Sequence, residues 1–348
     1  MERFSKSQLI SAGKAVVGPN PEVTPDLLEA FRVARAWREA HLEPMRRLRL
    51  SVASKVRAVT PVGLSAGRLK RFQSIRRKLK GGRISLYQMQ DIAGARAIVP
   101  TIADVEAVSG AYLEPSERFS LVNQRDYIAS PKDDGYRSRH IVVRLTGYPD
   151  LTGDNRITAE IQVRTKLQHA WATAVEAVGL ARGENLKAGE GDPLWRRFFE
   201  LVSADFAEIE NCPVGPSVND DSAERGRELR DLVGRTNALV VLDGYRQAIR
   251  ESERYLSLKG QSYVVRYDPV SQSVYVDSFS AFSRLSSADP YNSSDANNEV
   301  VVEVDAAYQL KEAYPNYFLD VTTFLHTLKR RLAKRTKWRR LAELMLKT

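Results

Sequence analysis

The sequence has few of the residues that build disulfide or zinc frameworks. Cys212 is the only cysteine among 348 residues, and there are four histidines. A single cysteine cannot form an intrachain disulfide or a cysteine-rich zinc site, so we expect a reducing compartment. The chain also lacks a signal-peptide-like apolar segment near its start, and it has no run of about 18 apolar residues. These absences predict a cytoplasmic protein without a membrane span.

Positive charge is in excess. Lys and Arg number 53 against 43 Asp and Glu, which gives a formal net charge of +10. Such a balance favours a polyanionic partner, which could be a nucleic acid, nucleotide phosphates or an anionic surface. Hydrophobic residues make up 43% of the chain, enough to bury a core in each of two domains.

The chain divides most naturally at residues 211–220. This segment, NCPVGPSVND, contains two prolines and a glycine, so we expect a linker there between a domain at 1–210 and a smaller domain at 221–348. Periodicity predicts the elements of the first domain: a helix from Pro25 interrupted near Pro44, a helix at 67–79, strands at 95–99, 139–145 and 156–164, and a helix at 165–178. The second domain is expected to contain a hairpin at 261–279, a strand at 299–304 and basic C-terminal helices.

The first motif of the expected site along the chain is basic. Arg68 is followed by Lys70, Ser74 and Lys78, and a helix at 67–79 would place the last three on one face, as a phosphate-binding surface requires. A solvated basic face is the simpler interpretation of this motif alone.

Acidic residues come from two further segments. Asp91 starts the segment Asp-Ile-Ala-Gly-Ala-Arg that ends at Arg96, where a structural ion pair is the simpler alternative. In the strand at 156–164, alternation puts Glu160, Gln162 and Arg164 on one face. Burying charged groups is costly unless they are paired or bind an ion, so this face predicts a functional site.

The segment from Arg125 to His140 gathers cations and aromatic rings around a Gly-Tyr turn. Its candidates for ligand binding are Arg125, Lys132, Tyr136 and His140, although a turn tyrosine can equally be a packing residue.

Together, these four segments resemble the synthetase domain of RelA/SpoT alarmone synthetases in order and spacing, over roughly residues 45 to 180. The resemblance implies an α+β protein: a nucleotidyltransferase-like mixed sheet flanked by helices, plus a smaller C-terminal α+β regulatory domain. It also implies a magnesium-dependent pyrophosphokinase that moves the β,γ-diphosphate of ATP to a ribose hydroxyl. No His-Asp dipeptide is present, so we expect no counterpart of the family's hydrolase domain.

The resemblance assigns a role to each motif residue. Asp91 and Glu160 would be the catalytic residues and would hold Mg²⁺, and Glu160 is also the expected base for the attacking hydroxyl. Arg68, Lys70, Ser74, Lys78 and Arg96 would bind ATP, with the two arginines on either side of adenine. The acceptor would be bound by Arg125, Lys132, Tyr136, His140, Gln162 and Arg164.

A short element of the second domain bears on regulation. Tyr314-Pro315-Asn316-Tyr317 resembles the Y-x-x-Y element by which the C-terminal antitoxin domain of CapRel fused toxin–antitoxins blocks the adenine pocket. This implies autoinhibition by Tyr314 and Tyr317, the 3′-hydroxyl of transfer RNA as acceptor, inhibition of translation, and a phage protein as trigger in antiviral defence. A proline-containing turn that seats two tyrosines in a local core is the structural alternative.

The acceptor has competing interpretations. Many nucleotide-specific relatives have asparagine where Asp134 stands, which favours transfer RNA over a free nucleotide. The alternative is a small alarmone synthetase that makes (p)ppGpp or (p)ppApp from ATP and GDP, GTP or adenine nucleotides. A third interpretation is a catalytically silent RNA-binding module. Eight of the 12 residues from Lys329 to Arg340 are basic and could contact RNA, although such a run is more often a solvated helix face.

Overall fold

The computed structural model describes residues 4–18, 24–114, 116–147, 157–184, 186, 189–248, 250–251, 262–268, 273–278, 299–305, 309–315 and 320–345. Its helices are α1 Lys6–Ala15, α2 Pro25–Ala40, α3 Leu42–Val59, α4 Phe72–Lys80, α5 Ile102–Gly110, α6 Lys166–Arg182, α7 Pro193–Ile209, α8 Ser222–Thr236, α9 Ala238–Ala248, α10 Gln309–Ala313 and α11 Thr322–Met345, with a short 3₁₀ helix, η1, at Leu86–Gln88. Its strands are β1 Leu64–Leu69, β2 Ala93–Val99, β3 Phe119–Asp126, β4 Arg139–Leu145, β5 Thr158–Thr165, β6 Arg250–Glu251, β7 Ser262–Asp268, β8 Ser273–Ser278 and β9 Glu299–Glu303.

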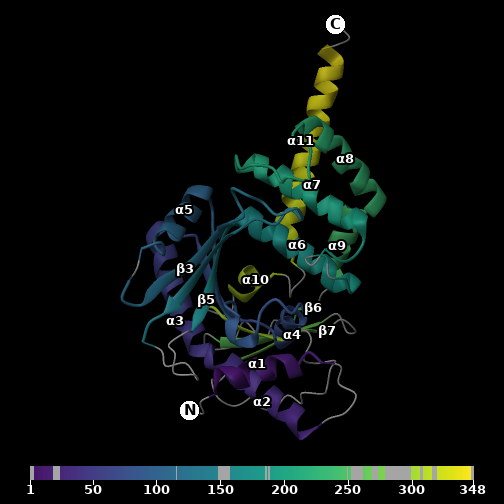
Figure 1. Cartoon of the computed structure of the whole chain (residues 1–348). Coiled ribbons are helices and arrows are strands. Elements are labelled where there is room, and N and C mark those ends of the chain that lie inside the picture. The colour runs from purple at the N-terminus through teal and green to yellow at the C-terminus, as the bar shows by residue number, and fades with distance from the viewer. Residues whose placement is uncertain are drawn as a thin grey trace.

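In the described part of the chain, nine strands form one mixed sheet in the order β3-β4-β5-β2-β1-β9-β7-β8-β6. β2 runs parallel to β5, and β6 runs parallel to β8, whereas the other neighbours are antiparallel. Helices lie above and below this sheet in Figure 1. The expected α+β class is therefore confirmed, with a mixed sheet flanked by helices.

Alternation along the central strands separates a core face from a polar face. Ala97, Ile161 and Val163 are completely buried, and they pack in one cluster with apolar residues of α3 and α5. The intervening residues of β2 and β5, which include Arg96, Glu160 and Gln162, point to the opposite face. This period-two pattern puts polar side chains from several strands side by side.

The sheet and one core cluster both contain residues from each side of the expected linker at 211–220. β9 pairs with β1, so that Gly67 lies opposite Glu303. A second cluster contains Trp171 and Phe199 from α6 and α7 together with Leu229 and Phe324 from α8 and α11. The two parts of the chain are thus in close contact, and the division at residues 211–220 remains a prediction.

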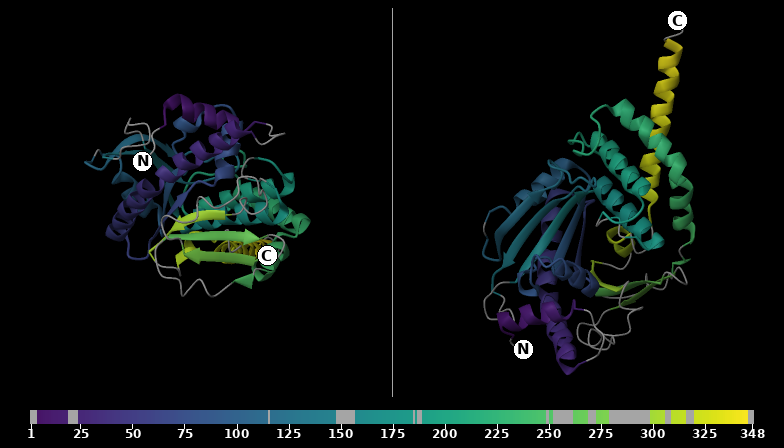
Figure 2. Two further views of the ribbon diagram at one scale, coloured as in Figure 1. Left: turned by 90° about the horizontal axis from the view of Figure 1, so that it is seen from below. Right: turned by 45° about the vertical axis from the view of Figure 1, so that its right-hand side comes forward.

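The last helix leaves the body of the molecule. In Figures 1 and 2, α11 passes beside the helices that cover the sheet and then projects beyond them. Arg331 anchors its first half, because its guanidinium group contacts both carboxylate oxygens of buried Asp205 at 2.8 and 2.9 Å. Within the described residues, no helix is long and apolar enough to cross a bilayer.

The predicted helix at 67–79 is wrong. Residues 64–69 form β1, which pairs with β2 on one side and with β9 on the other, and helix α4 begins only at Phe72. Lys70 therefore precedes the helix that carries Ser74 and Lys78, so these three side chains do not share a helix face. The basic spacing suggested a helix, whereas pairing with strands distant in the sequence stabilises a strand.

Candidate active site

A cavity of about 480 Å³ lies over the polar face of the sheet. β-Sheet register explains which residues reach it. Arg125, His140, Gln162 and Arg96 stand opposite one another on β3, β4, β5 and β2, and Glu160, Gly94 and Arg68 form the next row on β5, β2 and β1. Because neighbours in one row point to the same side of a sheet, these polar side chains meet in one cavity.

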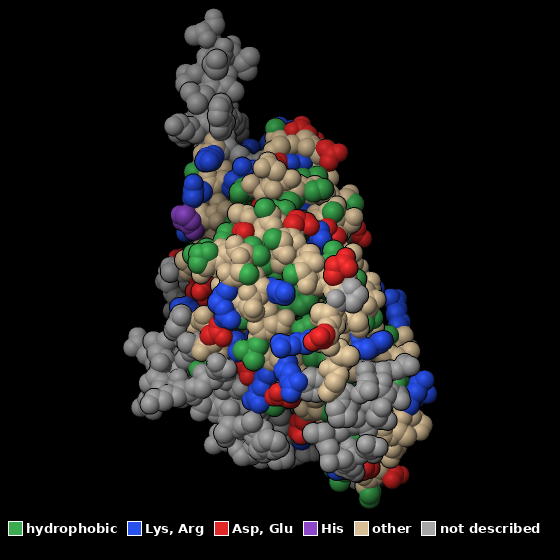
Figure 3. Space-filling model, turned by 90° about the vertical axis from the view of Figure 1, so that its left-hand side faces the viewer, with side chains coloured by type: hydrophobic (Ala, Val, Ile, Leu, Met, Phe, Trp, Pro, Cys, Tyr) green, Lys and Arg blue, Asp and Glu red, His purple; other side chains and the backbone are tan. Residues whose placement is uncertain are grey.

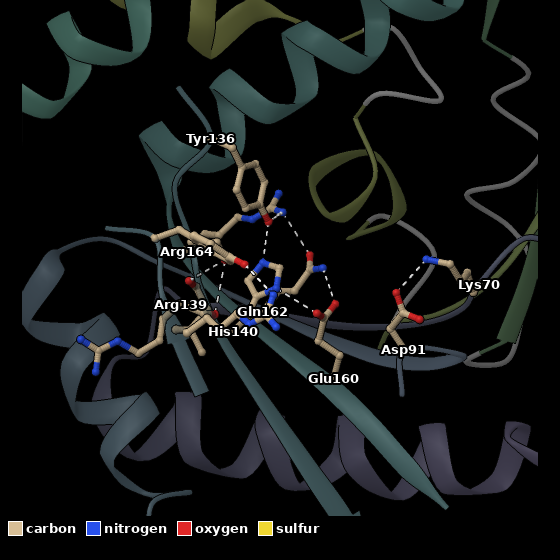
Figure 4. A network of polar contacts seen from close by, with 12 residues as sticks. Lys70, Asp91, Tyr136, Arg139, His140, Glu160, Gln162 and Arg164 are labelled. Atoms are coloured by element: carbon tan, nitrogen blue, oxygen red, sulfur yellow. Dashed lines mark hydrogen bonds and ion pairs between the residues drawn. The ribbon is translucent and has the colours of Figure 1, made fainter. Parts of the chain in front are cut away.

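Two lysines converge on one carboxylate at the ATP side of the expected site. The ammonium groups of Lys70 and Lys78 lie 2.8 and 2.9 Å from Oδ2 of Asp91 (Figure 4 shows the contact of Lys70). Burial by itself would raise the pKa of Asp91, but the two ammonium groups outweigh burial and lower that pKa. Burial lowers the pKa of Lys70, and Asp91 offsets part of this effect.

The other oxygen of Asp91 is buried and has no hydrogen-bond partner among the described residues. A buried carboxylate oxygen without a partner is costly, and a cation would satisfy it. No group of three or more His, Cys, Asp or Glu side chains that could hold a metal ion occurs in the described part of the chain. A divalent ion at Asp91 and Glu160 would therefore need further oxygen ligands from a substrate or water.

Glu160 is held by hydrogen bonds at both oxygens. Nδ1 of His140 lies 2.8 Å from Oε1, and the amide of Gln162 donates to Oε2 at 2.7 Å. Burial would raise the pKa of Glu160, but these bonds and the charge of Lys70 lower it to about 2. Its carboxylate is therefore ionised at neutral pH.

Arg68 and Arg96 both line the cavity, on adjacent strands β1 and β2. Arg96 is 7% exposed, and burial together with the nearby Arg164 and Arg68 lowers its pKa to about 9. The guanidinium group of Arg96 lies 5.7 Å from the ring centre of Tyr314. Tyr314 is completely buried, and its hydroxyl donates to the carbonyl oxygen of Gly67 at 2.7 Å.

The turn before β4 supplies a cluster of aromatic rings. The ammonium group of Lys132 lies 4.6 Å from the ring centre of Tyr127 and 5.1 Å from that of Tyr136. Gly135 shapes this turn with φ of +84°, and a Cβ atom there would come within 2.8 Å of Cβ of Ser203 on α7. Glycine therefore permits both the left-handed backbone and the close approach of α7.

The structure brings most of the predicted site residues together. Those that line the cavity are Arg68, Lys70, Lys78, Asp91, Arg96, Arg125, Lys132, Tyr136, His140, Glu160, Gln162 and Tyr314. Ser74 and Arg164 do not line it, and Tyr317 lies outside the described residues. The motifs missed Asn123 and Gln124 on β3, Val142 on β4, and Gln90. Asn123 could have been found as the residue two positions before Arg125 on the same strand.

Comparison with known proteins finds a family model that matches the central region. Residues 67–180 match the family model described as the region found in RelA / SpoT proteins. This match contains the second half of β1, all of β2 to β5, most of α6, and the cavity residues other than Ala66 and Tyr314. The class suggested by the four motifs is thus supported for this part of the chain.

Particular relatives are named GTP pyrophosphokinases. YjbM of Bacillus subtilis (strain 168) is 35% identical over 130 residues, which is 36% of this chain and 61% of that protein. YwaC of the same strain is 38% identical over 122 residues, covering 32% of this chain and 56% of that protein. The chain therefore spans about three fifths of the length of these curated relatives.

Solved structures with similarity include small alarmone synthetase 1 from Bacillus subtilis bound to its product pppGpp. It is 25% identical, has a TM-score of 0.44, and covers 53% of this chain and 94% of its own. A GTP pyrophosphokinase family protein from Streptococcus pneumoniae is 23% identical with a TM-score of 0.39, covering 57% of this chain and 94% of its own.

Proposed function

We propose that this protein is a pyrophosphokinase that transfers the β,γ-diphosphate of ATP to a ribose hydroxyl and releases AMP. One observation carries the proposal: a single cavity brings the cations Arg68, Lys70 and Lys78 together with the carboxylates of Asp91 and Glu160. Phosphoryl transfer depends on positioning and on the stabilisation of charge, and this set of side chains can supply both. The names of the relatives YjbM and YwaC support the same reaction.

ATP would bind in the half of the cavity formed by β1, β2 and α4. Lys70 and Lys78 share one carboxylate oxygen, so their remaining N–H groups can donate to phosphate oxygens. Arg68 and Arg96 would hold adenine between their guanidinium planes. Ser74 lies in α4 outside the cavity lining, so its contact with phosphate would need movement of that helix.

Asp91 and Glu160 would hold Mg²⁺, and the unpartnered oxygen of Asp91 fits this role. A bound magnesium ion would neutralise charge on the phosphates. The ionised carboxylate of Glu160 would also accept the proton of the acceptor hydroxyl, whose oxygen attacks the β-phosphorus as the bond to the α-phosphate breaks. Tyr136, Lys132, Arg125 and His140 would bind the acceptor at the other end of the cavity.

A guanosine nucleotide, GDP or GTP, is the acceptor that the relatives' names support best. Asp134 has a structural role in the turn, because its Oδ1 accepts a hydrogen bond from the backbone N–H of Tyr136 at 2.9 Å, and it also lines the cavity. The 3′-hydroxyl of transfer RNA is the second candidate, favoured by the net charge of +10. On the face shown in Figure 3, Lys and Arg side chains are interspersed with acidic ones, so that face offers RNA a mixed surface.

A CapRel-type autoinhibited toxin belongs with the second candidate, and the position of Tyr314 supports it. The ring of Tyr314 lies beside Arg96, and N–H of Arg96 donates to the carbonyl oxygen of Ala313 at 3.2 Å. Tyr314 thereby fills space that adenine would need on that side of Arg96. A phage protein that displaces the C-terminal part of the chain would be the trigger, with inhibition of translation as the result.

Supplying each acceptor separately would test this proposal. The protein would be incubated with β-labelled ATP, Mg²⁺ and either GDP, GTP or transfer RNA. We expect the label in a guanosine nucleotide, and label in RNA alone would replace this acceptor by the second candidate. Transfer RNA with a periodate-oxidised 3′ end is the matched control, because it lacks the reacting hydroxyl.

A further inference from the structure

Five side chains form a closed ring of hydrogen bonds beside the cavity (Figure 4). Arg164 contacts the hydroxyl of Tyr136 at 2.5 Å and Oε1 of Gln162 at 3.1 Å. The Tyr136 hydroxyl lies 2.7 Å from Nε2 of His140. His140 and Gln162 then meet the two oxygens of Glu160 at 2.8 and 2.7 Å. Two branches therefore leave Arg164 and converge on Glu160.

Chemistry fixes the direction of every bond in this ring except the one between Tyr136 and His140. A guanidinium group only donates and a carboxylate only accepts. The Tyr136 oxygen accepts from Arg164, and its bond to His140 is donated either by the Tyr136 O–H or by Nε2–H of His140. Because a carboxylate only accepts, Nδ1–H of His140 donates to Glu160. In the other branch, Gln162 accepts from Arg164 at its oxygen and donates to Glu160 from its nitrogen. The branch through Gln162 runs from a cation to an anion, an order in which successive hydrogen bonds polarise one another.

Arg164 itself does not reach the cavity. It is 3% exposed and absent from the cavity lining, whereas the other four members of the ring all line it. Its guanidinium group also lies 5.0 Å from the ring centre of Tyr136. The charge of Arg164 lowers the pKa of the neighbouring Arg96, so the two buried cations repel each other. A buried cation placed against another cation is costly, which points to a requirement other than packing.

We infer that Arg164 is a positioning residue: it holds Tyr136 and Gln162, and through them it orients His140 and the carboxylate of Glu160 toward the reacting hydroxyl. The reaction itself rests on the proposed function. This role differs from the acceptor contact that the sequence predicts for Arg164, because the structure places Tyr136 and Gln162 at the cavity and Arg164 behind them.

The experiment compares variants of the full-length chain that cut the ring at different bonds. Arg164→Lys keeps the charge but replaces the two-pronged donor by a point charge, Tyr136→Phe cuts one branch, and Gln162→Leu cuts the other. Arg139→Lys is the matched control. Arg139 lies on β4, is paired with Glu106 and Asp126, and is outside both the ring and the cavity lining.

The first readout is the hydrogen bonding of the two ring nitrogens of His140, measured by nitrogen-15 NMR at fixed pH on histidine-labelled protein without substrate. The resonance is assigned by its loss in His140→Gln. The ring predicts that both nitrogens are hydrogen-bonded in the wild type, Nδ1–H to Glu160 and Nε2 to Tyr136, and that both resonances shift in Arg164→Lys and Tyr136→Phe but not in Arg139→Lys. Unchanged His140 resonances in Arg164→Lys would overturn the inference whether or not the chain is active.

The second readout is steady-state transfer of label to the acceptor. We expect Arg164→Lys to lower kcat by about 10- to 100-fold with little change in the acceptor KM, because a misplaced catalytic group costs rate more than binding. In a chain that also carries Tyr136→Phe and Gln162→Leu, the same change should cost less than about twofold. A raised acceptor KM with unchanged kcat would show direct acceptor contact and would overturn the inference. Absence of transfer by the wild type counts against the proposed function, and the NMR comparison then decides the role of Arg164.

Discussion

Replacing Tyr314 separates its structural role from its role as an obstacle to ATP. The side chain is buried against Arg96, and its hydroxyl donates to Gly67 at 2.7 Å. Loss of a buried aromatic ring typically costs about 3–5 kcal/mol of unfolding free energy, whereas loss of one hydrogen bond costs about 1 kcal/mol. Tyr314→Ala should therefore be several kcal/mol less stable than the wild type, with Tyr314→Phe much nearer to it.

The effect on ATP should have the opposite sign. If the ring must leave before adenine stacks on Arg96, the apparent affinity for ATP is reduced by the small fraction of molecules in which the ring is displaced. Tyr314→Ala removes this competition, so we expect its affinity for a non-hydrolysable ATP analogue to rise by about tenfold or more. Isothermal titration calorimetry would measure the affinity, and urea unfolding would measure the stability.

Leu310→Ala is the matched control for Tyr314→Ala. Leu310 lies in α10 and is completely buried in the same core cluster, but it does not line the cavity. Its loss should destabilise the chain by about 2–5 kcal/mol without opening the adenine site. Equal gains in ATP affinity for both variants would show that general destabilisation of the core around α10 explains the effect. No gain for Tyr314→Ala would refute the account of Tyr314 as an obstacle.

Three further predictions concern stability. The pKa of Glu160 is lowered from 4.5 to about 2, so its ionised form stabilises the fold above about pH 4.5 by about 3 kcal/mol, and this contribution is lost as the pH falls toward 2. Urea unfolding from pH 7 to pH 3 should thus show a smaller loss of stability in Glu160→Gln than in the wild type, and parallel curves would contradict this. Gly135→Ala should lower the free energy of unfolding by more than about 1 kcal/mol, because Gly135 has a positive φ and an added Cβ would contact Ser203. Equal urea midpoints for this variant and the wild type would argue against that strain. Arg331→Ala leaves the carboxylate of Asp205 buried without this partner and should cost about 3 kcal/mol, whereas a change below 1 kcal/mol would show that α11 is anchored in another way.

Local pattern was sufficient to predict part of the site. Alternation along β5 placed Glu160, Gln162 and Arg164 on one face, and their mutual hydrogen bonds agree with that prediction. Thr165 and Gln168 form the capping box that starts α6, close to the predicted start of that helix. Such features depend on neighbours within a few residues, so the sequence contains them directly.

Long-range pairing accounts for what the sequence did not reveal. β1 is a strand because it pairs with β2 and β9, and its contact with Glu303 joins residues far apart in the chain. β3 was missed because its residues are half-buried or exposed and end in a polar run. The distinction between Gln162 at the cavity and Arg164 behind it depends on where Tyr136 lies, which no local pattern fixes.

The most direct test of the proposed reaction is its stoichiometry. Wild type and Tyr314→Ala would be incubated with β-labelled ATP, Mg²⁺ and GDP, and AMP would be measured alongside labelled guanosine nucleotide, with Asp91→Asn and Glu160→Gln as inactive controls. The account predicts one AMP for each labelled acceptor, faster formation with Tyr314→Ala, and loss of both products in the two controls. Label that appears only as inorganic phosphate or pyrophosphate, or transfer that survives Glu160→Gln, would contradict it.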